Sequence, residues 1–253
     1  MEIEYNEDNW REQLMKKIWK IMICMFVASS ICVQMPLTST VSAKRQKVIV
    51  INPGHQYRGN SSKEAIGPGS RTKKAKVTTG TRGVSSKQKE STINLAVGLK
   101  LKKELQKRGY KVIMTRTKQK VNISNKQRAL IGNKYKADAV ISLHCDGASS
   151  RSVRGAHTIS IKKNNPYCKK LYSKSNLLAK YVINSYCKET KIKNRGVNHR
   201  NDLTGLNWSK VPAIYIEMGF LSNKTEDKKL ASASFQIKCA RGIAKGIDKY
   251  FKR

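Results

Sequence analysis

The amino-acid sequence predicts an α/β fold, a single-domain three-layer sandwich whose mainly parallel sheet is flanked by helices. Two observations predict it. Between residues 47 and 251, short β-branched runs alternate with longer segments in which apolar residues recur about every four positions. The 253-residue chain also contains no internal repeat and no Pro/Gly/Ser-rich linker. We therefore expect one main domain at residues 44–253, preceded by a separate N-terminal segment at residues 1–43.

The first half of the domain is predicted to begin with a strand and to continue with a long polar segment. Lys47-Val-Ile-Val-Ile51 is a β-branched run that ends in Asn-Pro-Gly, which is typical of a strand followed by a tight turn. Residues 56–89 are rich in Gly, Ser, Thr and Lys, and a connection of that length is expected to be a functional surface loop. From Glu90 the pattern is helical until Gly109 ends it.

The second half repeats the alternation of strand and helix. Strands are predicted at residues 111–116, 137–144, 155–161 and 211–220, and helices at residues 124–136, 167–188 and 225–251. In an open α/β sheet, functional sites lie beyond the carboxyl ends of the strands. Polar residues at those ends are therefore the first candidates for chemistry.

Residues 1–43 have the pattern of a secretory signal peptide. Three lysines precede an apolar run at residues 21–33, and Val41-Ser-Ala43 supplies the small residues that signal peptidase requires. The alternative is an uncleaved membrane anchor, with transient membrane association through residues 18–37. A span needs about 20 apolar residues, and Gln34 and Pro36 interrupt this run. Both interpretations place the domain outside the cell, secreted or at the cell wall.

The net charge is strongly positive and belongs to the domain. Lys and Arg total 52 against 16 Asp and Glu, a formal charge of +36. Residues 1–43 hold four basic and five acidic residues, so the remainder carries +37. Such a surface favours polyanionic partners. Aromatic residues are only 7%, with no basic, aromatic-interleaved strand, so nucleic acid is not expected. Anionic cell-wall polymers are the expected partner.

Four polar residues fall at predicted element ends on one side of the sheet. His55 follows the first strand, His144 ends "DAVISLH", Glu217 ends "AIYIE", and Glu90 opens a helix on its core-facing stripe. Two histidines and a carboxylate, with one position open, form a recurrent ligand set for catalytic zinc. A further carboxylate then handles protons. We expect His55, Glu90 and His144 to bind Zn²⁺ and Glu217 to be the catalytic base.

Each of these residues also has a simpler interpretation. A strand-end histidine is often only a hydrogen-bonded core or surface group, and a glutamate in the first turn of a helix is favoured by the helix dipole alone. Glu217 alone fits a buried salt bridge. His157, in mid-strand, and His199, in a polar loop, are expected to be structural. The position of all four candidates on one side of the sheet favours a shared site.

The cysteines outside the N-terminal segment are expected to be isolated structural thiols, because no C-x-x-C spacing occurs among Cys145, Cys168, Cys187 and Cys239. Cys145 supports one rival function, since a cysteine beside His144 is compatible with a thiol hydrolase. Consecutive side chains of a strand point to opposite faces, however, so Cys145 is expected to face away from His144.

These residues and their motifs resemble those of the zinc-dependent N-acetylmuramoyl-L-alanine amidases, bacterial cell-wall enzymes with a six-stranded α/β fold. The resemblance runs from about Lys47 to the C-terminal helix. "INPGH" and "SLHCDGA" resemble the segments of the two zinc histidines, "ESTINLAVGLKLKKEL" resembles the helix of the zinc glutamate, and "IEMGFLSN" resembles the segment of the catalytic glutamate. Asp146 stands where the family usually has Asn, and Gln56-Tyr57 where it usually has glycines.

The resemblance implies hydrolysis of the amide bond between N-acetylmuramic acid and L-alanine in peptidoglycan, the expected substrate. Two alternatives stay open. One is a zinc peptidase or carboxypeptidase that acts on the stem peptide. The other is a non-catalytic cationic wall-binding protein, against which the presence of all four residues argues.

Overall fold

The computed structural model describes residues 7–29 and 45–252, which belong to two compact units, Met1–Arg45 and Gln46–Arg253. The described residues of the first unit form the helix α1 (Glu7–Ser29), whose described side chains are exposed, Trp10 and Trp19 among them. Among the described residues, no helix is both long and apolar enough to cross a membrane. The expected cleavage site at residues 41–43 lies outside the described residues.

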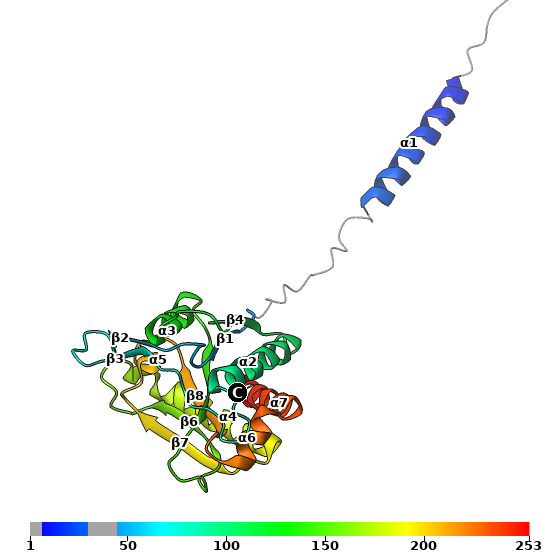
Figure 1. Cartoon of the computed structure of the whole chain (residues 1–253). Helices are drawn as coiled ribbons and strands as arrows, with labels where there is room; N and C mark the ends of the chain where they lie inside the picture. Colours follow the sequence, from blue (N-terminus) through cyan, green and yellow to red (C-terminus); the bar gives the residue numbers. More distant parts are fainter. Residues whose placement is uncertain (1–6, 30–44, 253) are drawn as a thin grey trace, which may run out of the picture. The chain divides into compact units, whose positions relative to one another are not determined.

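The second unit is built on a six-stranded sheet with the order β4-β1-β5-β8-β6-β7 (Figure 1). The strands are β4 (Lys111–Met114), β1 (Val48–Pro53), β5 (Ala139–Asp146), β8 (Ala213–Phe220), β6 (Ala156–Ile161) and β7 (Asn194–Arg200). The pairs β4–β1, β1–β5, β5–β8 and β6–β7 are parallel, and only β8–β6 is antiparallel. The predicted mainly parallel α/β sheet is therefore confirmed.

Helices cover both faces of this sheet and make it the middle layer of a sandwich (Figure 1). The larger core lies between the sheet and α2 (Glu90–Lys107), α4 (Tyr172–Thr190) and α7 (Ala233–Phe251). The smaller core lies on the other face, under α3 (Asn125–Lys134) and α5 (Thr204–Asn207). A 3₁₀ helix (Lys169–Leu171) precedes α4, and α6 (Lys224–Ala231) precedes α7.

The structure corrects several predicted elements. Residues 56–89 are not one loop, because they contain an antiparallel hairpin of β2 (Asn60–Ala65) and β3 (Lys73–Val77). The polar segment around His199 is not a loop either, because it forms edge strand β7. The C-terminal helical pattern is two helices that meet at Ser232. Strands β2 and β7 are largely exposed and polar. Their sequences therefore lack the alternation of apolar and polar residues from which a strand can be predicted.

Candidate metal centre and active site

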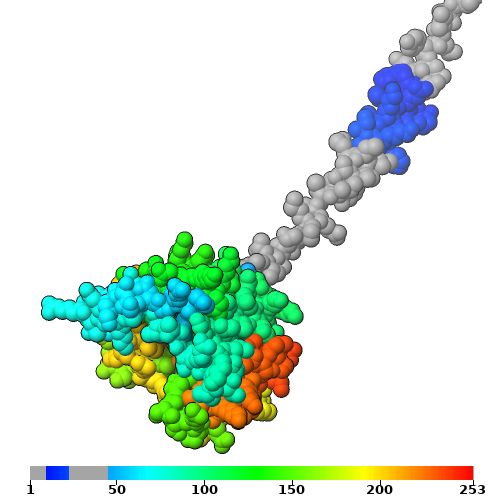
Figure 2. All heavy atoms as spheres, viewed as in Figure 1, coloured from blue at the N-terminus to red at the C-terminus, as the bar shows by residue number. Residues whose placement is uncertain are grey.

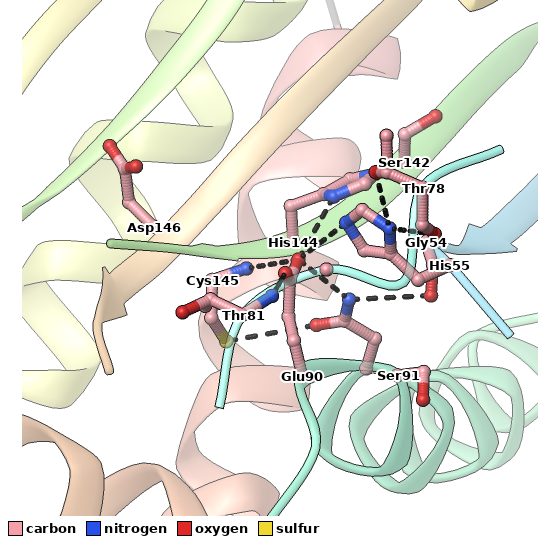
Figure 3. A network of polar contacts seen from close by, with 12 residues as sticks. Gly54, His55, Thr78, Thr81, Glu90, Ser91, Ser142, His144, Cys145 and Asp146 are labelled. Carbon is pink, nitrogen blue, oxygen red and sulfur yellow. Dashed lines mark hydrogen bonds and ion pairs between the residues drawn. The ribbon is translucent and has the colours of Figure 1, made fainter. Parts of the chain in front are cut away.

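Three of the four predicted site residues converge at the carboxyl edge of the sheet (Figure 3). His55 follows β1, Glu90 is the first residue of α2, and His144 lies near the end of β5. Glu90 Oε1 is 3.1 Å from His55 Nε2 and 3.0 Å from His144 Nδ1. One ligand atom from each residue lies within 4.8 Å of the others, so the three side chains could hold a metal ion.

Two glycines let these side chains approach one another. A Cβ atom at Gly54 would lie 2.2 Å from the His144 ring, closer than real carbon atoms come. A Cβ atom at Gly80 would lie 2.6 Å from Glu90 Oε2 and 2.8 Å from the ring of His55. Gly80 also has a φ of +78°, which favours glycine. The cluster therefore requires the absence of a side chain at both positions.

His55 is held in a strained backbone conformation by groups from several elements. Its φ of 57° is in the left-handed region, which a non-glycine residue rarely adopts. Arg128 Nη2 donates to the His55 carbonyl oxygen at 3.0 Å. The Nδ1 atom lies 2.8 Å from the Thr78 carbonyl oxygen, which only accepts, so Nδ1 carries the hydrogen. Nε2 then presents its lone pair toward Glu90.

Two buried arginines stabilise the chain that leads to His55, and the sequence analysis did not single them out. Arg116 Nε and Arg128 Nη1 each donate to the Pro53 carbonyl oxygen at 2.9 Å, and Arg116 Nη2 donates to that of Gly54 at 3.0 Å. Burial lowers the pKa of Arg116 to about 9 and that of Arg128 to about 10. No carboxylate among the described residues pairs with either guanidinium, so backbone carbonyls and the side-chain amide oxygens of Asn52 and Gln56 accept their hydrogen bonds.

Glu90 is held as a carboxylate. Besides the two imidazoles, Oε1 lies 3.1 Å from the Cys145 backbone nitrogen and 3.2 Å from Asn94 Nδ2, and Oε2 accepts from the Thr81 backbone nitrogen at 3.0 Å. Burial by itself raises the pKa of Glu90, but the hydrogen bonds and charges of the two histidines outweigh it and lower that pKa well below its usual range. An ionised carboxylate is the form that binds a metal.

The site fits a cation. His55 Nε2 lies 3.1 Å from an oxygen of Glu90, and lone pairs on two such atoms repel unless a proton or a metal ion lies between them. Burial opposes charge on His55, yet the hydrogen bond and charge of Glu90 raise its pKa above the ordinary value. The cluster therefore favours positive charge at this point, as a metal centre of two imidazoles and one carboxylate does.

Glu217 lies on β8 in register with His144 on the neighbouring strand β5. It is half-buried, and within the described part of the chain its carboxylate has no hydrogen-bond or ion-pair partner. Burial, followed by the charges of Glu90 and Asp146, raises the pKa of Glu217 well above its usual range. Glu217 therefore sits beside the cluster without joining it, as a carboxylate that can hold a proton.

Two hollows meet at this site. The first hollow has a volume of about 610 Å³ and is lined by Arg82, Asp146 and the small residues Gly147, Ala148 and Ser149. The second has a volume of about 450 Å³ and is lined by residues of the β2–β3 hairpin and of the segment that ends β7. Both are also lined by His55, His144 and Glu217. A molecule bound across the two hollows would pass over the cluster.

Cys145 faces away from the imidazoles, as strand alternation predicted. Its sulfur is buried against α2, 3.7 Å from Asn94 Oδ1, and Figure 3 shows it directed away from His144. Burial, with the charges of Glu90 and Glu217, raises the pKa of the thiol well above its usual value. A thiol nucleophile needs a lowered pKa and access to substrate, so the thiol hydrolase alternative is wrong.

The remaining histidines, His157 and His199, lie outside the cluster. His157 is the second residue of β6, and because β6 runs antiparallel to β8 it lies directly opposite Glu217. Its buried Nδ1 atom has no partner within the described part of the chain. His199 lies on the exposed strand β7, with Nε2 3.0 Å from Asn176 Oδ1.

Comparisons with known proteins agree on one family. The family model of the N-acetylmuramoyl-L-alanine amidases matches residues 49–249. The chain is 26% identical to the amidase AmiC of Neisseria meningitidis, in an alignment that covers 81% of this chain and 53% of that protein. It is 28% identical to the probable cell wall amidase LytH of Staphylococcus saprophyticus, in an alignment that covers 82% of this chain and 59% of that protein. It therefore spans little more than half of these two relatives. The crystal structure of an N-acetylmuramoyl-L-alanine amidase from Clostridium difficile 630 superposes with a TM-score of 0.67 at 28% identity, covering 82% and 97% of the chains.

Proposed function

The chain belongs to the N-acetylmuramoyl-L-alanine amidase family, and on this premise we propose that it hydrolyses the amide bond between N-acetylmuramic acid and L-alanine in peptidoglycan. The observation that carries the proposal is the convergence of His55, Glu90 and His144, with Glu217 beside them at the edge of the same sheet. Family membership supports the reaction class, and this geometry supports the roles that we propose for individual residues.

We propose that His55 Nε2, His144 Nδ1 and a Glu90 oxygen are the ligands of a zinc ion. Two imidazoles and one carboxylate are a recurrent protein ligand set for catalytic zinc, which keeps its fourth position for water or substrate. A zinc ion held there would polarise the scissile carbonyl group and lower the pKa of water to about 7. The hydrogen bond from His55 Nδ1 to the Thr78 carbonyl would fix the tautomer that leaves Nε2 free to bind it.

Glu217 is assigned the proton transfers. As the water oxygen attacks the lactyl carbonyl carbon, a Glu217 oxygen accepts the proton that the water loses. As the carbon–nitrogen bond breaks, Glu217 returns this proton to the nitrogen of L-alanine, which leaves as an amine. A base that also acts as an acid has to change protonation state near neutral pH, and the raised pKa of Glu217 supports this assignment.

Digestion of purified peptidoglycan tests the proposal. The amidase reaction frees the amino group of L-alanine, so labelling of new N-termini followed by mass analysis of the fragments should detect L-alanine at the start of released peptides. A carboxypeptidase would instead release a C-terminal amino acid, and a non-catalytic wall-binding protein would release nothing. Elemental analysis of wild type and His144→Ala tests the metal separately, with one zinc per chain expected only in wild type.

We also propose that the protein is exported through residues 1–43 and binds the anionic wall by its surface of +37. Charge attraction of this kind is screened by salt, because the Debye length falls to about 3 Å at 1 M. Sedimentation with insoluble walls across a salt series should show binding that weakens steeply. Binding that stays flat would indicate a specific pocket instead.

A further inference from the structure

The two hollows that meet at the metal cluster differ in charge. We call the hollow lined by Lys63, Lys73, Lys74 and Arg200 the cationic groove, and the hollow lined by Arg82 and Asp146 the neutral groove. Apart from the site residues His55, Glu90, His144 and Glu217, the cationic groove has four cations and one acid, Asp202, whereas the neutral groove has one cation and one acid. Figure 2 shows the hairpin that supplies the lysines, in cyan, protruding from the folded unit.

The one acid of the cationic groove is already neutralised. Asp202 accepts two hydrogen bonds from Arg200, at 2.8 and 2.7 Å, and one from Lys74 Nζ at 2.7 Å. The hydrogen bonds from Arg200 are the largest influence on the pKa of Asp202, and they lower it. Together with the hydrogen bond from Lys74 they outweigh burial, which raises this pKa, and keep it below its usual range. This bridge also ties strand β3 to the segment after β7, across the groove.

Lys63 and Lys73 are left to attract a ligand. Both are exposed residues of the hairpin, and in the described part of the chain no carboxylate lies within ion-pair distance of either ammonium. The cationic groove therefore keeps an excess of positive charge that leads directly to Glu217 and the two histidines. A carboxylate-bearing group is the ligand that this arrangement favours.

The two halves of the proposed substrate differ in charge in the same way. N-acetylmuramic acid is joined to the peptide through its only carboxyl group, so the sugar side of the scissile amide is uncharged. The peptide side ends in at least one free carboxylate. A carboxylate placed in the neutral groove would meet the opposed charges of Arg82 and Asp146, whereas in the cationic groove it would meet Lys63 and Lys73.

We propose that the cationic groove binds the peptide half of the substrate through its carboxylates and that the neutral groove binds the sugar half. The difference in charge between the grooves then sets the direction in which the substrate crosses the metal cluster. Lys63 and Lys73 are specificity-determining residues and do not touch the reacting atoms. This inference rests on the proposed amidase function.

The test compares two soluble N-acetylmuramoyl peptides that differ only in whether the peptide carboxyl groups are free or converted to carboxamides. Wild type should have the lower KM for the carboxylate form. The double variant Lys63→Gln/Lys73→Gln should raise that KM by about fivefold, the order expected when exposed ion pairs are lost. Its KM for the carboxamide and its kcat for both substrates should stay close to wild type.

The matched control is Lys103→Gln/Lys107→Gln on α2, which removes the same charge about 20 to 25 Å along the helix from Glu90. This control should change neither KM. Equal KM values for the two substrates in wild type would overturn the inference, and so would an equal loss in the two double variants, which would indicate attraction by net charge alone.

A second measurement separates the inference from the proposed function. Calorimetric titration with the free peptide product and with its C-terminal amide should show tighter binding of the carboxylate form by wild type, and loss of this difference in Lys63→Gln/Lys73→Gln. If neither muramoyl peptide is hydrolysed, the amidase proposal fails, while the calorimetric result still decides whether the groove recognises carboxylates. Equal affinities for the two peptides would overturn the groove assignment even in an active enzyme.

Discussion

The two ends of the site place a carboxylate in opposite surroundings. Around the proposed metal ligands His55, Glu90 and His144, which we call the ligand corner, five nitrogens lie within 3.2 Å of the Glu90 oxygens. At the base corner, which consists of Glu217 and His157, Glu217 has no polar partner within the described part of the chain and His157 Nδ1 has none either. The pKa of Glu90 is lowered and that of Glu217 is raised.

This difference shows that environment assigns roles to residues of the same type. A carboxylate surrounded by donors stays ionised and is suited to hold a metal, whereas a carboxylate with few partners can take up and release a proton. The backbone of the ligand corner is also held by several contacts. Arg116 and Arg128 stabilise the chain before His55, and Gly54 and Gly80 leave room for the ligands, so the ligand corner is rigid by construction.

Exchange of each carboxylate for its amide is the strongest test of this division. Glu217→Gln should leave zinc content near wild type and lower kcat by about 10²-fold or more, because only proton transfer is lost. Glu90→Gln should instead lower zinc content, because a neutral amide is a poorer ligand. Zinc content and amide hydrolysis are measured on both variants. A fully active Glu217→Gln enzyme would remove Glu217 from the mechanism.

Gly54→Ala tests the close packing of the ligand corner. The added methyl group would lie 2.2–2.7 Å from three atoms of the His144 ring, so the ring has to move. Displacement of a ligand should weaken zinc binding by about 10- to 100-fold, the range seen when groups that orient ligands are lost. Competition with a chelator measures the affinity. Gly109→Ala at the end of α2 is the control, because it adds backbone strain at a φ of +81° with open space around it and should leave zinc unchanged.

The contrast also explains what the sequence could and could not predict. His55, His144 and Glu217 stand out because each ends an apolar run, and Glu90 because it opens a periodic helix, so local pattern places all four at one edge, although their roles remain predictions. Arg116 and Arg128 look like two of 52 basic residues. Their importance comes from contacts with Pro53 and Gly54, 62 to 75 residues away, and no local pattern reports such contacts.

His157→Gln tests whether the base corner is as poorly hydrogen-bonded as its geometry indicates. Burial lowers the pKa of His157 below 6.5. The charge of Asp146 partly offsets this effect, and the charge of Arg195 adds to it. The unfolded chain therefore takes up this proton first as the pH falls. The contribution of neutral His157 to stability is fully present above about pH 6.5 and is lost as the pH falls toward the folded pKa.

Thermal unfolding midpoints measured from pH 7.5 to 5.0 provide the comparison. The wild-type midpoint should fall more steeply than that of His157→Gln, because glutamine does not titrate in this range. The other histidines and carboxylates are common to both proteins, so the difference between the two curves isolates His157. Parallel curves would mean that His157 finds a partner for its charged form, which would contradict the description of the base corner.

The smallest effect is expected at Cys145, which lies beside His144 in sequence but on the opposite face of the sheet. Cys145→Ser replaces a buried thiol near Asn94 Oδ1 with a smaller polar group, so we expect a loss of about 1 kcal/mol in stability, which is a fall of about 2–4 °C in Tm. Zinc content and kcat should stay within about twofold of wild type, because the thiol is buried against α2 and faces away from the imidazoles. An inactive variant whose fold and zinc content are intact would return the thiol to the mechanism, and it would also show that the two faces of β5 are not separated as the contrast between the ligand corner and the core requires.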